Sequence, residues 1–380
     1  MTKPEHLADL LIASGRLADD RWRDGLLAVP RHLFVPARAS AVPDRPRHAA
    51  FEIDRDADPG LWRETVYSDS VISAQVDGEG TWTSSCSAPG IVIPFLQELR
   101  PLEHHRILEI GTGTGWTAAL LSWRVGEKNV TSVEIDPELS ARARANVRAA
   151  GYAPRLVVGD GAEGFAEGAP YDRVHATCGV ERVPYAWVEQ SRPGAVMVLP
   201  WSPAWGPGHV ARFTVAEDKA VGRLLGPCGF MMLRSQRRPL GPPDGVAGQR
   251  GEAAVSATRI DPRTLVGDAP GLDLAVAGSL PDVRSHLEGS LDGSVRLWAL
   301  AGDSSWASVD FVPGRAESEV RQYGGRRLWD EVEAAFLRWV EWGQPGRERF
   351  GVTVSAEGQR VWLDRPDQPL SRPPDTFSWA

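Results

Sequence analysis

The residues best suited to chemistry form a glycine-rich loop, Gly111-Thr112-Gly113-Thr114-Gly115, between an apolar segment at 105–110 and a helical pattern at 116–125. Glycine lets the backbone approach a ligand closely and adopt conformations closed to other residues, and a helix N-terminus stands behind it. Glu134 ends the next apolar segment, 129–135, near the place where an acid grips ribose hydroxyls in dinucleotide-binding folds. The order strand, loop, helix, strand, acid therefore indicates a nucleotide-like cofactor.

Two departures from the dinucleotide pattern bear on which cofactor this loop would hold. Trp116 stands where the third glycine of a GxGxxG motif allows close contact between helix and strand, and an indole is too large for that role. Glu109, inside the strand before the loop, would repel a pyrophosphate but suits a cationic ligand. S-adenosylmethionine carries a sulfonium and an ammonium group, and Asp160-Gly161 offers its adenine amino group an acceptor.

We therefore expect S-adenosylmethionine, with a nicotinamide dinucleotide or a glycine turn without any ligand as the alternatives. The residues expected to bind the cofactor are Glu109, Gly111, Gly113, Gly115, Glu134, Ile135, Asp160 and Gly161. No metal site is expected, because the three cysteines form no CxxC pair and are interpreted as small buried hydrophobic residues.

Short apolar segments alternate with helical patterns through the middle of the chain, and these elements must position the loop. Strands are expected at 105–110, 129–135, 155–160, 171–177 and 194–200, and helices at 116–125 and 137–151. Continuous apolar strands that alternate with helices are typical of a parallel sheet covered on both faces. The expected fold class is therefore α/β, a doubly wound, Rossmann-like sheet that would bind S-adenosylmethionine.

Four regions are expected along the 380 residues. Residues 1–89 would hold N-terminal helices and an irregular, loop-like substrate-side segment, and residues 90–235 the cofactor-binding core. Residues 236–250, rich in Pro, Gly and Arg, are expected to be a linker, and residues 251–380 an additional α+β C-terminal domain. In that domain we expect strands at 294–300 and 305–312, an amphipathic helix at 326–342 and a hairpin at 349–364.

Charge and hydropathy exclude several classes of partner. A net charge of −8 argues against a protein built to neutralise nucleic-acid phosphates. The chain has no run of 18 apolar residues that would suit a membrane-spanning helix, and its first thirty residues lack the apolar core of a signal peptide. We therefore expect a cytoplasmic protein without nucleic-acid or membrane partners, and leave its oligomeric state open.

Seven motifs follow one another along residues 29–174: VPRHLFVP, Tyr67-Ser68-Asp69, Ser85-Cys86-Ser87-Ala88-Pro89, ILEIGTGTGWTAALL, VEID, GDG and APYDRV. With these motifs, residues 20–235 resemble the protein-L-isoaspartate O-methyltransferases. The resemblance implies an enzyme that uses S-adenosylmethionine to esterify an isoaspartyl carboxylate borne by a peptide or protein. It also implies a catalytic hydroxyl at Ser87, supported by Ser85, and substrate contacts at Tyr67 and Asp69.

The chain departs from that family in two places. Residues 70–85, SVISAQVDGEGTWTSS, replace a proline-rich loop and carry Trp82. The C-terminal extension resembles a tail of methyltransferases from lanthipeptide-type pathways, which esterify an Asp of a partner peptide on the way to aspartimide and isoaspartate. The resemblance therefore implies either tailoring of a ribosomally made peptide, which the extension favours, or general repair of isoaspartyl proteins.

Esterification of a carboxylate by methyl transfer requires the protein to align the reactants rather than to move a proton. A carboxylate with a pKa near ~4 is already a nucleophile at pH 7, so no general base is required. Methyl transfer needs alignment of the carboxylate with water excluded, and a serine hydroxyl can orient one oxygen without trapping the anion. Ser87 is the first candidate for that role. A small-molecule methyltransferase and a non-catalytic cofactor-binding module are the alternatives from other classes.

Aromatic and basic residues of the extension suggest a second hypothesis. Trp329, Trp339 and Trp342 recur at helical spacing beside Arg326, Arg327 and Arg338. Tryptophans at this spacing either pack into a core or, with the arginines, bind an acidic, apolar peptide. We expect residues 251–380 to select the substrate rather than to perform chemistry. The basic run RSQRR at 234–238 is interpreted as a solvated linker that could meet an acidic peptide.

Overall fold

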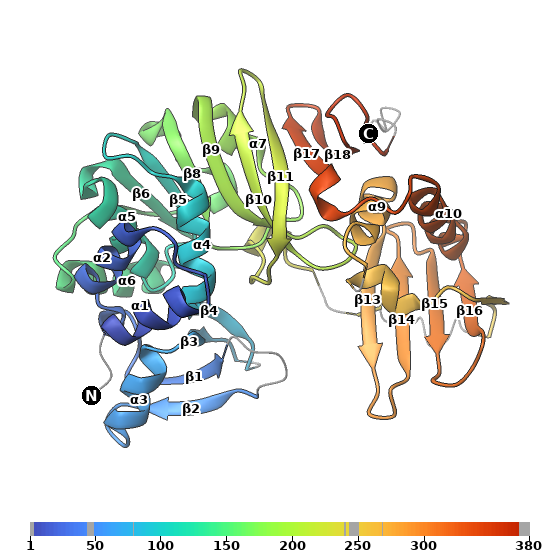
Figure 1. Cartoon of the computed structure of the whole chain (residues 1–380), viewed down its shortest axis with the longest axis horizontal. Helices are drawn as coiled ribbons and strands as arrows, with labels where there is room; N and C mark the ends of the chain where they lie inside the picture. The colour runs from blue at the N-terminus through green and yellow to red at the C-terminus, as the bar shows by residue number, and fades with distance from the viewer. Residues whose placement is uncertain are drawn as a thin grey trace.

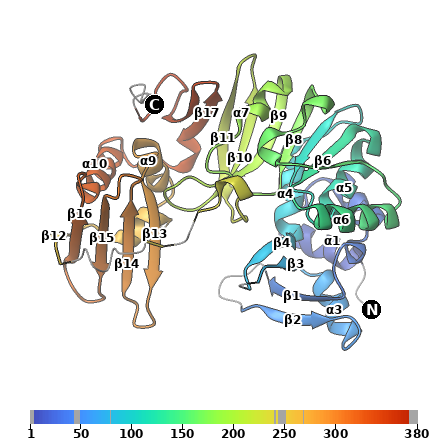
Figure 2. The same cartoon turned by 180° about the vertical axis from the view of Figure 1, so that it is seen from behind.

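The structure is a computed structural model, which describes residues 4–43, 49–78, 80–238, 241–242, 251–267 and 269–371. It contains a nine-stranded sheet flanked by a four-stranded and a five-stranded sheet. Figures 1 and 2 show the large sheet across the upper part of the molecule, with the four-stranded sheet below one side of it and the five-stranded sheet below and beyond the other. In the described residues no helix is long and apolar enough to cross a membrane.

The large sheet confirms the doubly wound fold. Its strand order is β18-β17-β11-β10-β9-β8-β5-β6-β7, and β9, β8, β5, β6 and β7 run parallel. The strands of this core are β5 (Ile107–Ile110), β6 (Val130–Glu134), β7 (Arg155–Val158), β8 (Tyr171–Ala176), β9 (Ser191–Trp201), β10 (His209–Val215) and β11 (Lys219–Pro227). Its helices are α4 (Pro89–Leu99), α5 (Trp116–Val125), α6 (Pro137–Ala149) and α7 (Tyr185–Glu189). The chain order reverses between β5 and β8, which is where open α/β sheets bind their ligands.

The N-terminal region is more regular than its sequence predicts. The segment expected to be irregular and loop-like forms, in its described residues, an antiparallel sheet of order β2-β1-β3-β4, with one helix packed against it. The elements of the region are α1 (Pro4–Ala13), α2 (Asp20–Ala28), β1 (Arg38–Pro43), β2 (Phe51–Asp54), α3 (Pro59–Val66), β3 (Ser70–Val76) and β4 (Trp82–Cys86). Turn-forming Pro, Asp, Ser and Gly residues conceal these strands, because tertiary pairing overrides their weak propensity.

The C-terminal region forms the five-stranded antiparallel sheet and also contributes a hairpin to the large sheet. Its elements are β12 (Ala254–Thr258), α9 (Leu272–Ser279), β13 (Arg284–Gly289), β14 (Val295–Leu300), β15 (Trp306–Phe311), β16 (Ser318–Tyr323), α10 (Leu328–Glu341), β17 (Phe350–Ser355) and β18 (Gly358–Leu363). The predicted hairpin at 349–364 is present, but β17 pairs with β11 and so extends the large sheet. Of the predicted linker 236–250, residues 239–240 and 243–250 lie outside the described residues.

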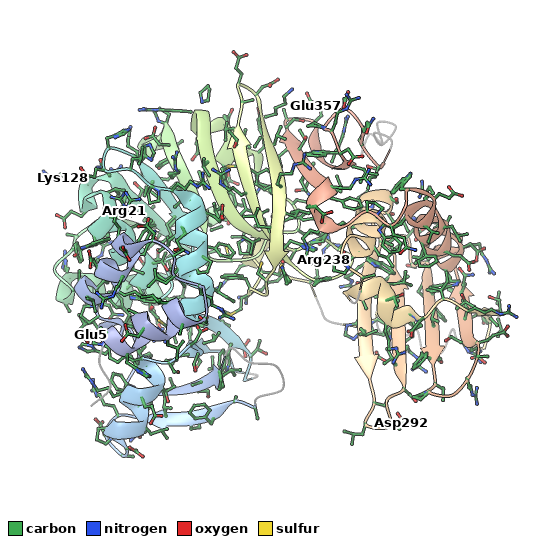
Figure 3. All side chains as sticks on the ribbon, viewed as in Figure 1. Glu5, Arg21, Lys128, Arg238, Asp292 and Glu357 are labelled. Carbon is green, nitrogen blue, oxygen red and sulfur yellow. The ribbon has the colours of Figure 1, made fainter. Side chains whose placement is uncertain are left out.

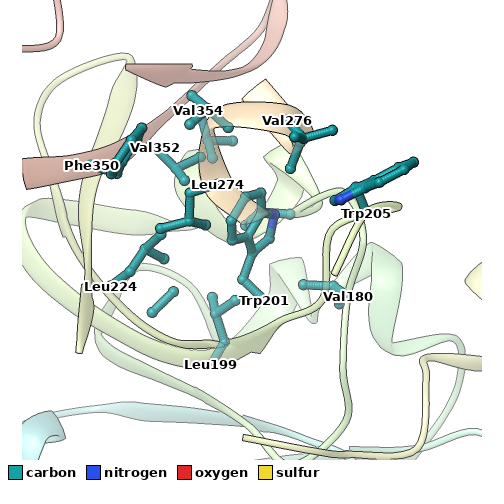
Figure 4. Close-up of a cluster of buried hydrophobic side chains, with 14 of the residues drawn as sticks. Val180, Leu199, Trp201, Trp205, Leu224, Leu274, Val276, Phe350, Val352 and Val354 are labelled. Atoms are coloured by element: carbon teal, nitrogen blue, oxygen red, sulfur yellow. The ribbon is translucent and has the colours of Figure 1, made fainter. Parts of the chain in front are cut away.

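The large sheet and the C-terminal region share one hydrophobic core. Leu199, Trp201 and Leu224 from the large sheet meet Leu274 and Val276 of α9 and the apolar face of β17 in a single cluster (Figure 4). Two polar contacts cross the same interface. The indole Nε1 of Trp205 donates to the Leu265 carbonyl at 2.8 Å, and His209 Nε2 lies 3.0 Å from Asp273 Oδ2, both side chains being buried.

The tryptophans of α10 belong to this core. Trp329 and Trp339 are 3% and 7% exposed, and Trp342 is partly buried against the same cluster. Arg326 is paired with Asp282 and Glu331. The hypothesis of a peptide-binding groove built from these tryptophans is therefore wrong, because helical spacing here turns the indoles inward.

This shared core predicts that Trp205 stabilises the whole chain. Trp205→Ala should lower the free energy of unfolding, measured by urea denaturation, by about 3–5 kcal/mol, because it empties a fully buried indole site. Leu337→Ala, at a position 52% exposed on α10, should change it by less than about 0.5 kcal/mol. Equal effects of the two substitutions would contradict a continuous core.

Candidate active site

The glycine loop lies at the end of β5, where three of its residues need left-handed backbone. Gly111, Gly113 and Gly115 have φ values of 89°, 55° and 90°. A Cβ on Gly111 would lie 2.5 Å from Thr177 Oγ1, and one on Gly115 2.7 Å from Val147. The sequence therefore needs glycine here for both conformation and space.

A cavity opens beside this loop, and most of the predicted site residues line it. They are Ser85, Ser87, Gly111, Gly113, Glu134, Ile135, Asp160 and Gly161. The cavity wall continues through the hairpin of β3 and β4, including Trp82, and through residues 229–234 and Arg237. Ser87 and the glycine loop therefore face one space, as a methyl transfer between two bound molecules requires.

Glu134 fits the cofactor that the sequence predicts. It is 6% exposed, its Oε2 accepts the Gly113 N–H at 2.9 Å, and its Oε1 accepts the Asp136 N–H at 3.1 Å. Each carboxylate oxygen can accept a second hydrogen bond, so ribose hydroxyls can bind without disturbing the loop. Ile135, next in the chain, offers an apolar surface for a flat ring, and Asp160 lines the same cavity.

Four predicted site residues do not line the cavity. Gly115 instead forms the left-handed N-cap of α5. Tyr67 is buried, with its hydroxyl 2.6 Å from His32 Nδ1. Asp69 accepts the Gly90 N–H at 2.7 Å and pairs with Arg16 at 2.5 Å. Asp69 therefore holds the backbone of Gly90, and neither Tyr67 nor Asp69 lies in the cavity wall where a substrate contact was predicted.

Glu109, the fourth, is fully buried beneath the loop. Ser132 Oγ donates to its Oε2 at 2.5 Å, and Ser132 Oγ lies 2.6 Å from Thr112 Oγ1. Burial raises the pKa of Glu109 to about 8, so its neutral form predominates at pH 7. The structure therefore does not place Glu109 where it would repel a pyrophosphate or attract a cation, since the side chain is not in the cavity wall and burial favours its neutral form.

Arg31 of the VPRHLFVP motif is a positioning residue that the sequence analysis missed. It is 1% exposed, and its guanidinium donates to the carbonyls of Val66, Ser68, Ser70, Cys86 and Ser87 at 2.7–3.3 Å. It thereby ties the ends of β3 and β4 to the turn that carries Ser87. The lone Arg inside an apolar, proline-bracketed motif was the available signal.

Residues 229–237 form a second element that the sequence analysis missed. The run RSQRR, interpreted as a linker, places Arg234 and Arg237 in the cavity wall. Arg234 lies 3.2 Å from Asp136, which also accepts from Gln75 at 3.0 Å. The pKa of Asp136 is lowered to about 2, mainly by the hydrogen bond from Gln75. Hydrogen bonds from the N–H groups at the start of α6 and from Arg234 act in the same direction. A polar bridge therefore joins β3, the start of α6 and residues 229–237 at the cavity rim.

The cysteines and the possible metal ligands were the other candidates for chemistry in this region. Cys178 lines the cavity, but burial and the charge of Glu134 raise the pKa of its thiol to about 12. All three cysteines are free thiols. Within the described ranges, no three His, Cys, Asp or Glu side chains gather in a way that could hold a metal ion.

The geometry predicts that Glu134 contributes to cofactor affinity. Glu134→Ala should raise the dissociation constant of S-adenosylmethionine about tenfold or more, because hydrogen bonds to a charged group are lost. Calorimetry on the folded variant measures this constant. Glu138→Ala, an exposed carboxylate in the first turn of α6, is the matched control and should leave it unchanged. Equal constants for wild type and Glu134→Ala would rule out the ribose assignment.

Known proteins match the chain over this same region. A family model described as protein-L-isoaspartate(D-aspartate) O-methyltransferase matches residues 38–237. Proteins named protein-L-isoaspartate O-methyltransferase from Methanopyrus kandleri and Ignicoccus hospitalis are 31% and 32% identical over 236 residues each. The alignments cover 60% and 61% of this chain, and 90% and 97% of those proteins.

A solved structure shows the same fold over almost the whole chain. It is named protein-L-isoaspartate O-methyltransferase, with a TM-score of 0.56 and 22% identity, and covers 95% of this chain and 100% of that one. The fold likeness therefore extends beyond the cofactor-binding core into the C-terminal region. The chain belongs to the protein-L-isoaspartate(D-aspartate) O-methyltransferase family and is an S-adenosylmethionine-dependent carboxyl O-methyltransferase.

Proposed function

We propose that this protein esterifies the free carboxylate of an isoaspartyl or aspartyl residue within a peptide or protein. The observation that carries the proposal is that Ser87 lines the same cavity as Gly111, Gly113 and Glu134. An acceptor bound at Ser87 would therefore meet a cofactor bound along the glycine loop. The names of the relatives, which specify isoaspartate, support this acceptor.

The residues of the cavity suit a reaction that needs alignment rather than proton transfer. The acceptor carboxylate is ionised at pH 7 and attacks without a base. Bound S-adenosylmethionine supplies an electrophilic methyl group. Ser87 donates a hydrogen bond to one carboxylate oxygen and so directs the other, while Arg31 fixes the Ser87 carbonyl at 3.0 Å. Ser85, on the same wall, supports the acceptor from β4.

Apolar side chains of the wall would exclude water from the reacting atoms. Phe230 lines the cavity and packs against Phe95 of α4, with ring centroids 5.4 Å apart. Met231, Met232 and Trp82 line the same space. Excluding water strengthens the hydrogen bond from Ser87 to an anionic acceptor, because the local dielectric constant falls.

Repair of isoaspartyl proteins is the role that we favour. The C-terminal extension does not by itself distinguish tailoring from repair, since the fold of a solved isoaspartate methyltransferase covers it as well. Tailoring of a ribosomally made peptide remains the second candidate. It is supported by the extension's resemblance to lanthipeptide-type methyltransferases and by Trp82, which the departure from the family at 70–85 brings into the cavity wall.

Ser87 should affect turnover more than binding. Ser87→Ala should lower kcat on an isoaspartyl peptide about tenfold or more, because a hydrogen bond to the charged acceptor is lost. The dissociation constant of S-adenosylmethionine should stay within about twofold, since the hydroxyl is proposed to contact only the acceptor. Radiolabelled methyl transfer and calorimetry measure the two quantities.

Ser85→Ala is the matched control for that experiment. Its effect on kcat should be smaller than that of Ser87→Ala, because Ser85 is proposed only to support the acceptor. Wild-type turnover by Ser87→Ala, or a larger loss in Ser85→Ala, would move the catalytic role away from Ser87.

A pair of peptides that differ only in one linkage tests the acceptor. Under repair, an isoaspartyl peptide should be methylated efficiently across unrelated sequences, while the matched aspartyl peptide and free small acids should not. Mass spectrometry of the methyl ester measures the rates. Methylation of an Asp in one particular peptide, with isoaspartyl peptides left unmodified, would reject repair in favour of tailoring.

A further inference from the structure

Residues 229–237, which form one wall of the cavity, have little regular structure of their own. Between β11 and residue 238 they contain only an isolated bridge from Met232 to Gly179 and a single 3-10 turn, Arg234–Gln236. Backbone bonds of 2.8 Å join Gly179 N–H to the Met231 carbonyl and Leu233 N–H to the Gly179 carbonyl. The position of the wall therefore depends on residues 179–183, the loop between β8 and α7.

The side chain of Gln236 strengthens this dependence. Its Oε1 accepts the N–H groups of Glu181 and Arg182 at 2.8 and 3.0 Å, and its Nε2 donates to the Arg182 carbonyl at 2.7 Å. Arg238 adds an ion pair to the Glu181 carboxylate at 2.9 Å. Figure 3 shows Arg238 where the large sheet approaches the C-terminal region.

A second glutamine holds the same loop from the opposite side. Gln359, on β18, accepts the Val183 N–H through Oε1 at 3.1 Å and donates from Nε2 to the Glu181 carbonyl at 3.1 Å. The β17–β18 hairpin that carries it is itself fixed to β11 by backbone pairing. The backbone of the loop 179–183 is thus bound by two amide side chains: Gln236 comes from the cavity wall at 229–237, and Gln359 comes from the C-terminal hairpin.

We propose that Gln359 is a positioning residue, through which the C-terminal hairpin sets the place of residues 229–237 and hence of the acceptor in the cavity. Its role in turnover rests on the proposed function. The extension then acts on methyl transfer by holding a wall of the site, without contributing a residue to the chemistry or a groove for the peptide.

Hydrogen exchange tests the positioning without any assumption about the substrate. Gln359→Ala should speed amide exchange in residues 179–183 and 229–237, while β17 and β11 keep their protection because their backbone pairing is intact. Arg360→Ala, on the same strand with its side chain on the other face, is the matched control and should leave these segments unchanged. Unchanged exchange in 229–237 of Gln359→Ala would overturn the proposal.

Kinetics with an isoaspartyl peptide test the consequence. Gln359→Ala should lower kcat/KM about fivefold, mainly through KM, which is the loss expected from one neutral hydrogen bond. Gln359→Glu keeps the acceptor for Val183 N–H and should recover part of that loss. The double variant with Gln236→Ala should be non-additive in kcat/KM, because both side chains hold one loop.

The outcomes separate the two proposals. Independent, multiplicative effects of Gln236→Ala and Gln359→Ala, or a loss of kcat/KM that only follows a loss of folded protein, would overturn the positioning role. Faster exchange in 229–237 combined with a wild-type enzyme that leaves isoaspartyl peptides unmodified would support the positioning role and reject the proposed acceptor.

Discussion

The acceptor side of the cavity depends on one buried guanidinium. Arg31 is removed from water and, among the residues that the structure describes, pairs with no carboxylate, so its charge is stabilised by five backbone carbonyls and by the face of Trp116, 5.3 Å away. Those carbonyls belong to three segments: the end of α3, the start of β3, and the turn after β4. Arg31 is bound to all three and so holds them together. Because one rigid fork binds them all, the Ser87 turn has little freedom to move.

Two carboxylates, Glu134 and Glu109, bind the residues around the glycine loop, and they differ in whether they line the cavity. Glu134 lies at the cavity and fixes Gly113 and Asp136 through their N–H groups. Glu109, only one strand away, is fully buried, and its pKa is raised to about 8. Glu134 therefore lines the cavity, while Glu109 accepts from Ser132 beneath the loop. Arg234 and Arg237 line the same cavity, and Arg234 lies 3.2 Å from Asp136, two residues after Glu134.

The parts of the site that could be predicted are those fixed by local sequence. The turn after β5 needs glycine, Asp136 caps α6 through the N–H groups of Glu138 and Leu139, and both features can be read within a few residues. The positions of Tyr67 and Asp69 depend on partners 35 and 53 residues earlier in the chain, His32 and Arg16, which no local pattern specifies. The hairpin at 349–364 was predictable as a hairpin, whereas its pairing with β11 was not.

That pairing constrains what the C-terminal extension can do. Without β17, β11 would be an exposed edge of the large sheet, and the apolar face of β17 would leave the core that it shares with Trp201 and α9. The region is joined to the core by a continuous sheet, a buried His209–Asp273 contact and two glutamines on one loop, while its selection of the substrate stays a prediction. The route that we propose for its influence on the substrate is the wall at 229–237, whose backbone is bound by Gly179 of the loop 179–183.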